Sequence, residues 1–253
     1  MTSAKNRTVI VTGAAQGIGF AIAESFIAEG DFVAVFDLNL EAAESAAAKL
    51  GNAKGFAVNV ANEEQVKAAM DQLVAERGSV DVVVNNAGLQ FISPVEDFPL
   101  EKWNLLIDVI LTGTFLVTKH ALPVMKKQQK GRIINISSAH GRIPDAYKSA
   151  YVAAKFGVVG FTQTAALETA QDGITVNAIM PGPVRTELIE RQLPELAKQD
   201  GTSVHEALNH HILGKQWMKR LLEPSEIGAT AVFLASDGAA AITGESIGVT
   251  GGM

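Results

Sequence analysis

The sequence predicts an α/β fold in which helices cover both faces of a parallel sheet. Short apolar runs alternate with helical patterns along the whole chain, and the first run leads directly into a glycine-rich turn. No segment between Lys5 and Gly252 has the composition of a linker. We therefore expect a single domain that spans residues 1–253.

Composition narrows the range of functions. Hydrophobic residues make up 47% of the chain and charged residues 19%, which is enough apolar material for a large core. The net charge is -6 and no long block of lysine or arginine occurs, so we expect a small-molecule partner and neither nucleic acid nor a membrane. The chain has no cysteine, which excludes disulfides, thiolate-bound metals and a cysteine nucleophile. The N-terminal residues lack the apolar core of a signal peptide, so we expect a cytoplasmic protein.

The first strand is predicted at residues 8–12, and a glycine loop, GAAQGIG, follows it at residues 13–19. A helix is expected from there to about residue 29. Glycines at this place let the backbone approach a pyrophosphate, whose charge the helix N-terminus stabilises. Glycines also mark ordinary turns, but the position between a strand and a helix favours a phosphate site. The expected dinucleotide contacts here are Gly13, Gln16, Gly17, Ile18 and Gly19.

The second strand, at residues 32–36, ends next to Asp37. An acidic side chain at this distance from the glycine loop can accept both ribose hydroxyls of NAD and repels the additional phosphate of NADP. No arginine or lysine occurs between residues 31 and 48. The sequence therefore predicts NAD as the cofactor. The alternative is that Asp37 caps the next helix, although Asn39 is at least as well placed for that role.

The fourth strand, at residues 81–84, runs into Asn85, Asn86, Ala87 and Gly88. Polar side chains at the carboxyl end of a parallel strand lie where α/β sheets bind ligands, so Asn86, Ala87 and Gly88 are expected beside the cofactor. The asparagines also suit a second, compatible role, which is to hold neighbouring loop backbone. Further strands are predicted at residues 54–60, 131–138, 175–180 and 246–250, and further helices from Asn62, with Gln65 completing a capping box, and at 100–127, 149–168 and 225–236.

Ser138, Tyr151 and Lys155 are the candidate catalytic residues. Ser138 ends an apolar strand, and the helix that follows places Tyr151 and Lys155 on one face, four residues apart. A nearby positive charge favours the phenolate and lowers a tyrosine pKa, so Tyr151 is a candidate general acid/base. A lone Tyr-x-x-x-Lys is more often a buried aromatic beside a surface lysine. The strand-end serine and the glycine loop favour a catalytic role for this pair.

The glycine spacing G-x-x-x-G-x-G and the set Ser138, Tyr151 and Lys155 together resemble the short-chain dehydrogenase/reductase family along nearly the whole chain. The resemblance implies a Rossmann fold with a doubly wound, seven-stranded parallel sheet in the order 3-2-1-4-5-6-7, flanked by helices. It implies an NAD-dependent oxidoreductase and, because the family commonly forms tetramers, a homotetramer. The cofactor contacts that it adds are Asn59, which replaces a customary aspartate, and Val60, Tyr151, Lys155, Pro181, Gly182, Val184 and Thr186.

One residue departs from that family pattern. The family has a catalytic asparagine where this chain has Ile110, and that asparagine helps to hold a water that relays protons to the lysine. Isoleucine has no side-chain hydrogen bond to offer. Either the backbone carbonyl still holds the water, or proton exchange with solvent is impaired.

Gln90, His140, Lys148 and Gln192 indicate a site for a small carboxylate close to the catalytic residues. An anion that approaches an acidic protein needs a local cation and amide donors. Taken singly, each is more often an ordinary loop or surface residue. With the phrases SSAHG, YKSAYVAAKFGVVGFT and ERQL, the four resemble the D-3-hydroxybutyrate dehydrogenases of that family. That resemblance implies oxidation of D-3-hydroxybutyrate to acetoacetate, with Ser138 and Tyr151 also touching the substrate.

Residues 187–222 are too long for a plain connector before the helix signalled by Pro224, so we expect a substrate lid. The alternative is a helical pair that packs or forms a subunit contact. His205, His210 and His211 lie here without a carboxylate cluster of recognised metal spacing, so we expect surface histidines and no metal.

Two other functions stay open at the level of sequence. One is a family member that acts on another alcohol, a sugar or a 3-oxoacyl substrate. The other is a regulatory protein that binds a dinucleotide without turnover, for which Ile110 is the only hint.

Overall fold

The computed structural model describes residues 6–253, apart from the side chains at 188, 191, 192, 195, 196 and 199. Its sheet has seven strands in the order β3-β2-β1-β4-β5-β6-β7, and every neighbouring pair is parallel. The predicted fold class and strand order are confirmed. The strands are β1 (Thr8–Thr12), β2 (Phe32–Asp37), β3 (Ala53–Ala57), β4 (Val82–Asn85), β5 (Gly131–Ile136), β6 (Ile174–Pro181) and β7 (Ser246–Val249).

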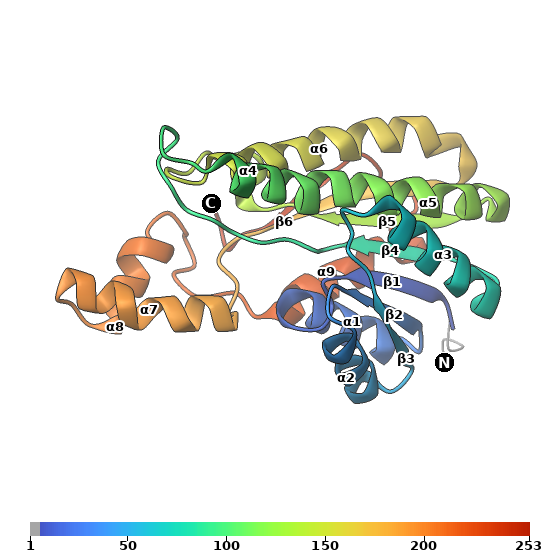
Figure 1. Ribbon diagram of the computed structural model, residues 1–253, viewed down its shortest axis with the longest axis horizontal. Coiled ribbons are helices and arrows are strands. Elements are labelled where there is room, and N and C mark those ends of the chain that lie inside the picture. The colour runs from blue at the N-terminus through green and yellow to red at the C-terminus, as the bar shows by residue number, and fades with distance from the viewer. Residues whose placement is uncertain (1–5) are drawn as a thin grey trace.

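Helices cover both faces of the sheet (Figure 1). On one face α1 (Gly17–Ala28), α2 (Leu40–Leu50) and α9 (Pro224–Leu234) share a buried apolar cluster with the strands. On the other, α3 (Glu63–Arg77), α5 (Gly113–Gln128) and α6 (Ser149–Thr169) share a second cluster. Because both faces are covered, all residues of β4, β5 and β6 are buried, and these strands are mostly apolar without a strict apolar–polar alternation.

The third strand ends three residues earlier than predicted, because the chain turns at Asn59. The Asn59 side-chain oxygen accepts the Ala61 N–H at 3.0 Å, which is local bonding that competes with strand pairing. The predicted capping box at the start of α3 is only half formed. Asn62 caps the Gln65 N–H at 3.0 Å, but the Gln65 side chain accepts the N–H of Asn59 instead of that of Asn62.

Residues 100–128 are helical throughout, but a turn of π-helix at Asp108–Thr112 separates α4 (Leu100–Ile107) from α5. By length and composition alone this stretch could cross a membrane. It lies instead against α6, and α5 packs on α3, as a core helix of the fold does. Leu106, Ile110 and Val117 are buried there.

The segment from 187 to 222 forms α7 (Glu187–Asp200), α8 (Val204–Ala207) and a second π-turn at Leu208–Ile212. These helices project from the body of the molecule, on the side away from the N-terminus (Figure 1). Both ends of the segment meet, since Val184 and Leu222 form a parallel bridge. The segment therefore leaves and rejoins the fold at one place.

Candidate active site

The glycine loop between β1 and α1 has the geometry that close backbone approach requires. Gly13 and Gly17 have φ of 62° and 59°, which is left-handed backbone that favours glycine. A Cβ on Gly19 would overlap the carbonyl oxygen of Gly13, so only glycine fits. No side chain caps α1, no acidic residue lies in its first turn, and Gln16 and Gly17 are exposed. This helix N-terminus suits a phosphate.

Asp37 lies at the end of β2, beside that loop. Its Oδ2 accepts the backbone N–H of Ala15 at 3.1 Å. Asn39, and not Asp37, caps α2 by accepting the Ala42 N–H at 3.0 Å. The capping alternative for Asp37 is therefore wrong, and its carboxylate stays next to the glycine loop.

Asn86 connects the end of β4 to the loop after β1. Its amide donates to the carbonyls of Thr12 and Gly13 at 3.0 and 3.2 Å, and the Thr12 hydroxyl accepts the N–H groups of Asn86 and Ala87 at 2.9 Å each. Asn86 thus has the structural role expected of it. Gly88 borders the catalytic residues, because a Cβ built on it would lie 3.9 Å from Lys155 Nζ.

The remaining residues expected at the cofactor also lie at the carboxyl ends of strands. Val60 is buried after β3, and Pro181 and Gly182 end β6, where a Cβ on Gly182 would meet the Thr250 carbonyl at 2.7 Å. The others are Val184, which is buried in the bridge to Leu222, and Thr186, which precedes α7 without a side-chain capping bond.

Ser138, Tyr151 and Lys155 come together as predicted from the sequence. Ser138 lies two residues beyond β5, is buried and hydrogen-bonds the Tyr151 side chain. Tyr151 and Lys155 share one face of α6, with Lys155 Nζ 5.6 Å from the centre of the tyrosine ring. Lys155 is buried and donates to the carbonyl of Ile136 at 2.7 Å.

Beside this set lie two of the residues expected to bind a carboxylate. The rings of His140 and Tyr151 are 6.3 Å apart, and Lys148 directly precedes α6. Gln90 Oε1 is buried without a hydrogen-bond partner among the described residues. Gln192 lies in α7, and its side chain is outside the described part of the chain.

Asp145 was missed from the sequence. Its Oδ2 accepts a hydrogen bond from Lys148 Nζ at 2.7 Å and lies 3.5 Å from His140 Nε2. The only signal in the sequence is its place three residues before Lys148, and that spacing in a loop does not predict a contact.

The comparisons with known proteins agree with this geometry. The family model described as short chain dehydrogenase matches residues 7–196. The chain belongs to the short-chain dehydrogenase family. It is 45% identical over 252 residues to the uncharacterized oxidoreductase YxjF of Bacillus subtilis, which covers 98% of both chains.

Among the relatives of this short-chain dehydrogenase are two that are named for the same substrate. The D-beta-hydroxybutyrate dehydrogenase of Cupriavidus necator is 41% identical over 250 residues, 97% of each chain. The enzyme of the same name from Rhizobium meliloti is 40% identical over 253 residues, 97% of this chain and 98% of the relative. The chain is therefore an oxidoreductase of this family that uses a nicotinamide dinucleotide and a small-molecule substrate.

The protein alone does not activate its tyrosine as expected. Burial raises the pKa of Tyr151, and the hydrogen bond with Ser138 offsets this only in part. The prediction that Lys155 lowers the Tyr151 pKa is therefore wrong for the chain without its cofactor. Burial also lowers the pKa of Lys155, to about 8, and no carboxylate in the described part of the chain offsets this effect.

Replacing Lys155 with methionine should stabilise the fold at neutral pH. A pKa of about 8 in the folded state against 10.5 in the unfolded chain corresponds to about 3 kcal/mol. The unfolded chain binds the proton more tightly, so this penalty is complete below pH 8 and disappears as pH rises to about 10.5. Loss of the hydrogen bond to the Ile136 carbonyl destabilises the variant by about 1 kcal/mol and so offsets part of this gain.

Urea unfolding of the cofactor-free protein at several pH values tests this prediction. The difference between variant and wild type should be about 2 kcal/mol at pH 7 and should shrink toward pH 10. Lys127→Met, which removes an exposed lysine, should show no such trend. A destabilised Lys155→Met protein at pH 7 would contradict the assignment of a buried, uncompensated ammonium.

Ile110 occupies the π-turn and faces the catalytic lysine across Gly88. A Cβ on Gly88 would lie 3.8 Å from Ile110 Cγ1 and 3.9 Å from Lys155 Nζ. Ile110 is buried in an apolar cluster with Leu106 and Ala154. Its carbonyl oxygen accepts a hydrogen bond from the Thr114 hydroxyl at 2.7 Å, which takes up part of its capacity to bind a water. Of the two readings left open by the sequence, this contact favours impaired proton exchange.

Ile110→Asn should therefore raise kcat by about tenfold, since it returns a polar side chain beside Lys155. The solvent isotope effect on kcat should fall at the same time. Ile110→Val, which keeps the site apolar, serves as the control. If kcat does not rise although the variant stays folded, Ile110 does not limit turnover.

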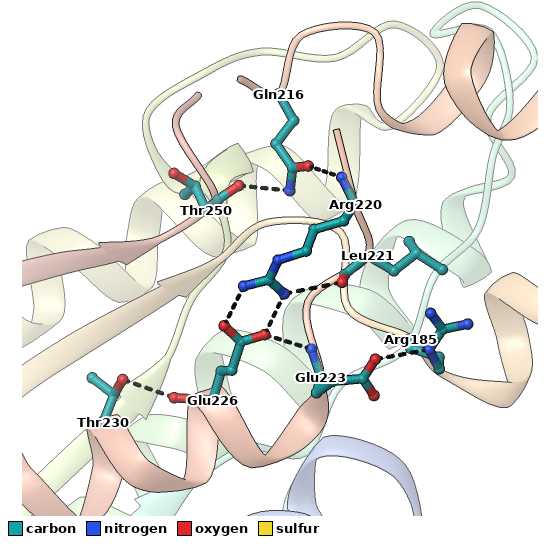
Figure 2. Close-up of polar contacts among 8 residues, drawn as sticks. All are labelled: Arg185, Gln216, Arg220, Leu221, Glu223, Glu226, Thr230 and Thr250. Carbon is teal, nitrogen blue, oxygen red and sulfur yellow. Dashed lines mark hydrogen bonds and ion pairs between the residues drawn. The ribbon is translucent and has the colours of Figure 1, made fainter. Parts of the chain in front are cut away.

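The return end of the segment 187–222 is firmly held (Figure 2). Arg220 makes two hydrogen bonds of 2.7 Å to Glu226 in α9, which lower the pKa of that carboxyl to about 2. Gln216 is buried. Its side-chain oxygen accepts the backbone N–H of Arg220 at 2.9 Å, and its side-chain nitrogen donates to the Thr250 carbonyl at 3.0 Å. These contacts attach the return end of the segment to α9 and to the chain after β7.

The histidines of this segment are exposed, as expected. The fold nevertheless brings Asp200 to 2.5 Å from His211 Nε2 and 4.0 Å from His210 Nδ1, a carboxylate neighbour that their spacing did not reveal. His205 instead contacts the Asn209 amide at 3.0 Å.

Proposed function

We propose that the chain is an NAD-dependent dehydrogenase that interconverts D-3-hydroxybutyrate and acetoacetate. The observation that carries this proposal is the position of Lys148 and His140 beside Ser138 and Tyr151. We propose that the first pair binds the substrate carboxylate and that the second binds the hydroxyl two carbons away. The two named hydroxybutyrate dehydrogenases among its relatives support the same substrate.

The polar groups of this pocket suit a small acid. Burial lowers the pKa of His140, and the charge of Lys148 lowers it further against the opposing effects of Ile143 and Asp145. His140 is therefore a neutral hydrogen-bonding group at neutral pH, and Lys148 supplies the charge. Gln90 Oε1 is buried and accepts no hydrogen bond among the described residues, and the NH₂ group of the same amide is the part that can donate to a carboxylate.

The proposed chemistry assigns one task to each catalytic residue. Tyr151 takes the hydroxyl proton, Ser138 hydrogen-bonds the substrate oxygen and holds the tyrosine, and Lys155 supports the tyrosine and the nicotinamide ribose. A nicotinamide dinucleotide held by the glycine loop would supply the hydride acceptor, and the positive charge of its oxidised ring would lower the pKa of the adjacent acids. That charge supplies the activation that the protein alone lacks.

The glycine loop, with the uncapped N-terminus of α1, suits the pyrophosphate, and Asp37 suits the ribose hydroxyls of NAD. We propose a cytoplasmic homotetramer that binds neither nucleic acid nor membranes. Exposed apolar side chains on α5 and α6, including Phe115, Phe156 and Leu167, suit a subunit contact. Residues 187–222 act as the substrate lid, and the chain is one domain.

Formation of NADH from a panel of alcohols tests this function. The purified protein should oxidise D-3-hydroxybutyrate with NAD, and should use L-3-hydroxybutyrate, 2-butanol and NADP poorly. Turnover only of neutral alcohols would contradict the carboxylate pocket while leaving the catalytic residues in place. No turnover with any alcohol, together with tight NADH binding, would favour a regulatory protein.

A further inference from the structure

Asp145 places a carboxylate on the cation that the proposed function assigns to the substrate. Lys148 Nζ donates to Asp145 Oδ2 at 2.7 Å, and His140 Nε2 lies 3.5 Å from the same oxygen. The side chains of Lys148, Asp145 and His140 are 22%, 31% and 21% exposed. The group is thus partly shielded from water but open to exchange with a ligand.

The charges around this group still favour one further anion. Burial acts to raise the pKa of Asp145, but the hydrogen bond and charge of Lys148 outweigh it, so the carboxyl is ionised at neutral pH. Lys215, from the returning end of the segment 187–222, adds a second positive charge that acts on both Asp145 and His140. Two lysines, one aspartate and a neutral histidine leave an excess of one positive charge.

On the basis of the proposed function, we propose that Asp145 is an internal carboxylate that competes with the substrate carboxylate for Lys148. An incoming hydroxy acid must displace Asp145 from the ammonium, whereas a neutral alcohol does not need to. Asp145 therefore limits the affinity for acids and sets the selectivity between acids and neutral alcohols.

The loop has room for this displacement. Asp145 lies between the end of the short helix Ala139–Gly141 and the start of α6 at Ser149, and both Ala146 and Tyr147 beside it are exposed. A released Asp145 carboxylate is stabilised by water and by the charge of Lys215.

Asp145→Asn tests the proposal, because it removes the charge and keeps the size of the side chain. The KM for D-3-hydroxybutyrate should fall about threefold to tenfold, with kcat within about twofold of wild type. Butyrate has no hydroxyl to oxidise, so its inhibition constant should fall by the same factor. The KM for 2-butanol should not change.

Two matched variants separate competition from a general effect of charge. Asp71→Asn also removes one negative charge from an aspartate–lysine pair, that with Lys67 at 2.5 Å on α3, and should leave every constant unchanged. In a Lys148→Met background, Asp145→Asn should no longer strengthen binding of either acid. An equal gain in that background would show that Asp145 acts by repulsion alone and would overturn the proposal.

An unchanged or higher KM and butyrate constant in Asp145→Asn would also overturn it, because Asp145 would then merely hold Lys148 in place. Failure of this proposal can be distinguished from failure of the proposed function. If wild-type protein oxidises only neutral alcohols, the proposed function fails. Butyrate inhibition of 2-butanol oxidation that strengthens in Asp145→Asn would still support competition at Lys148, and the absence of such strengthening would refute it.

Discussion

Tyr151→Phe should lower kcat by about a thousandfold while leaving the dissociation constant for NADH within about threefold of wild type. The phenol oxygen is the only part removed, and it is the group that we propose takes the substrate proton. Ser138 loses its hydrogen bond with Tyr151 but still accepts the His140 N–H, and the ring still packs beside Lys155 and His140. Turnover assays and fluorescence titration with NADH measure the two effects separately.

The chain offers a matched control for this variant. It has two tyrosines, and the second, Tyr147, is 60% exposed. Tyr147→Phe removes the same atom four residues away and should leave turnover within about twofold. Retention of a tenth or more of wild-type turnover by Tyr151→Phe would refute its role as the general acid/base.

Asp37→Ser should raise the ratio of kcat/KM with NADP to kcat/KM with NAD by about a hundredfold. The change removes the proposed acceptor of the ribose hydroxyls, together with a charge that would repel a phosphate at the same place. Asp37 also accepts the Ala15 N–H at 3.1 Å, and serine can keep that contact through its hydroxyl. Steady-state kinetics with both cofactors measure the ratio.

Glu41→Gln is the control for Asp37, because it removes an exposed negative charge from the first turn of α2. It should leave the cofactor ratio unchanged. A wild-type preference for NADP, or an equal ratio in wild type and Asp37→Ser, would contradict the assignment of NAD.

Local patterns in the sequence predicted the elements that local physics determines. Strand β1 matches its predicted range because an apolar run ends at a glycine turn, and Asn39 and Pro224 start their helices as their side chains dictate. The predicted end of β3 was wrong because hydrogen bonding by the Asn59 side chain outweighs strand propensity. The strand order came from family resemblance, because no local pattern determines which distant strands pair.

The sequence predicts the relative positions of site residues that lie on one helix or strand. It does not predict properties that depend on how the rest of the fold surrounds them. The spacing of Tyr151 and Lys155 follows from helix geometry. Their pKa values depend on burial by the whole fold, which no motif expresses, and the Tyr151 shift is opposite to expectation. The ion pair of Asp145 with Lys148 depends on the conformation of their loop. The ion pair of Asp200 with His211 depends on how α7 packs against the turn at 208–212.

The central claim is that a carboxylate on the substrate is recognised beside the catalytic tyrosine. Reduction of acetoacetate and of methyl acetoacetate by NADH tests it most directly, because the two ketones differ only in the charge and the methyl group at the position that faces Lys148. We predict a kcat/KM for acetoacetate on the order of a hundredfold higher than for its ester. Equal or faster reduction of the ester would contradict the claim.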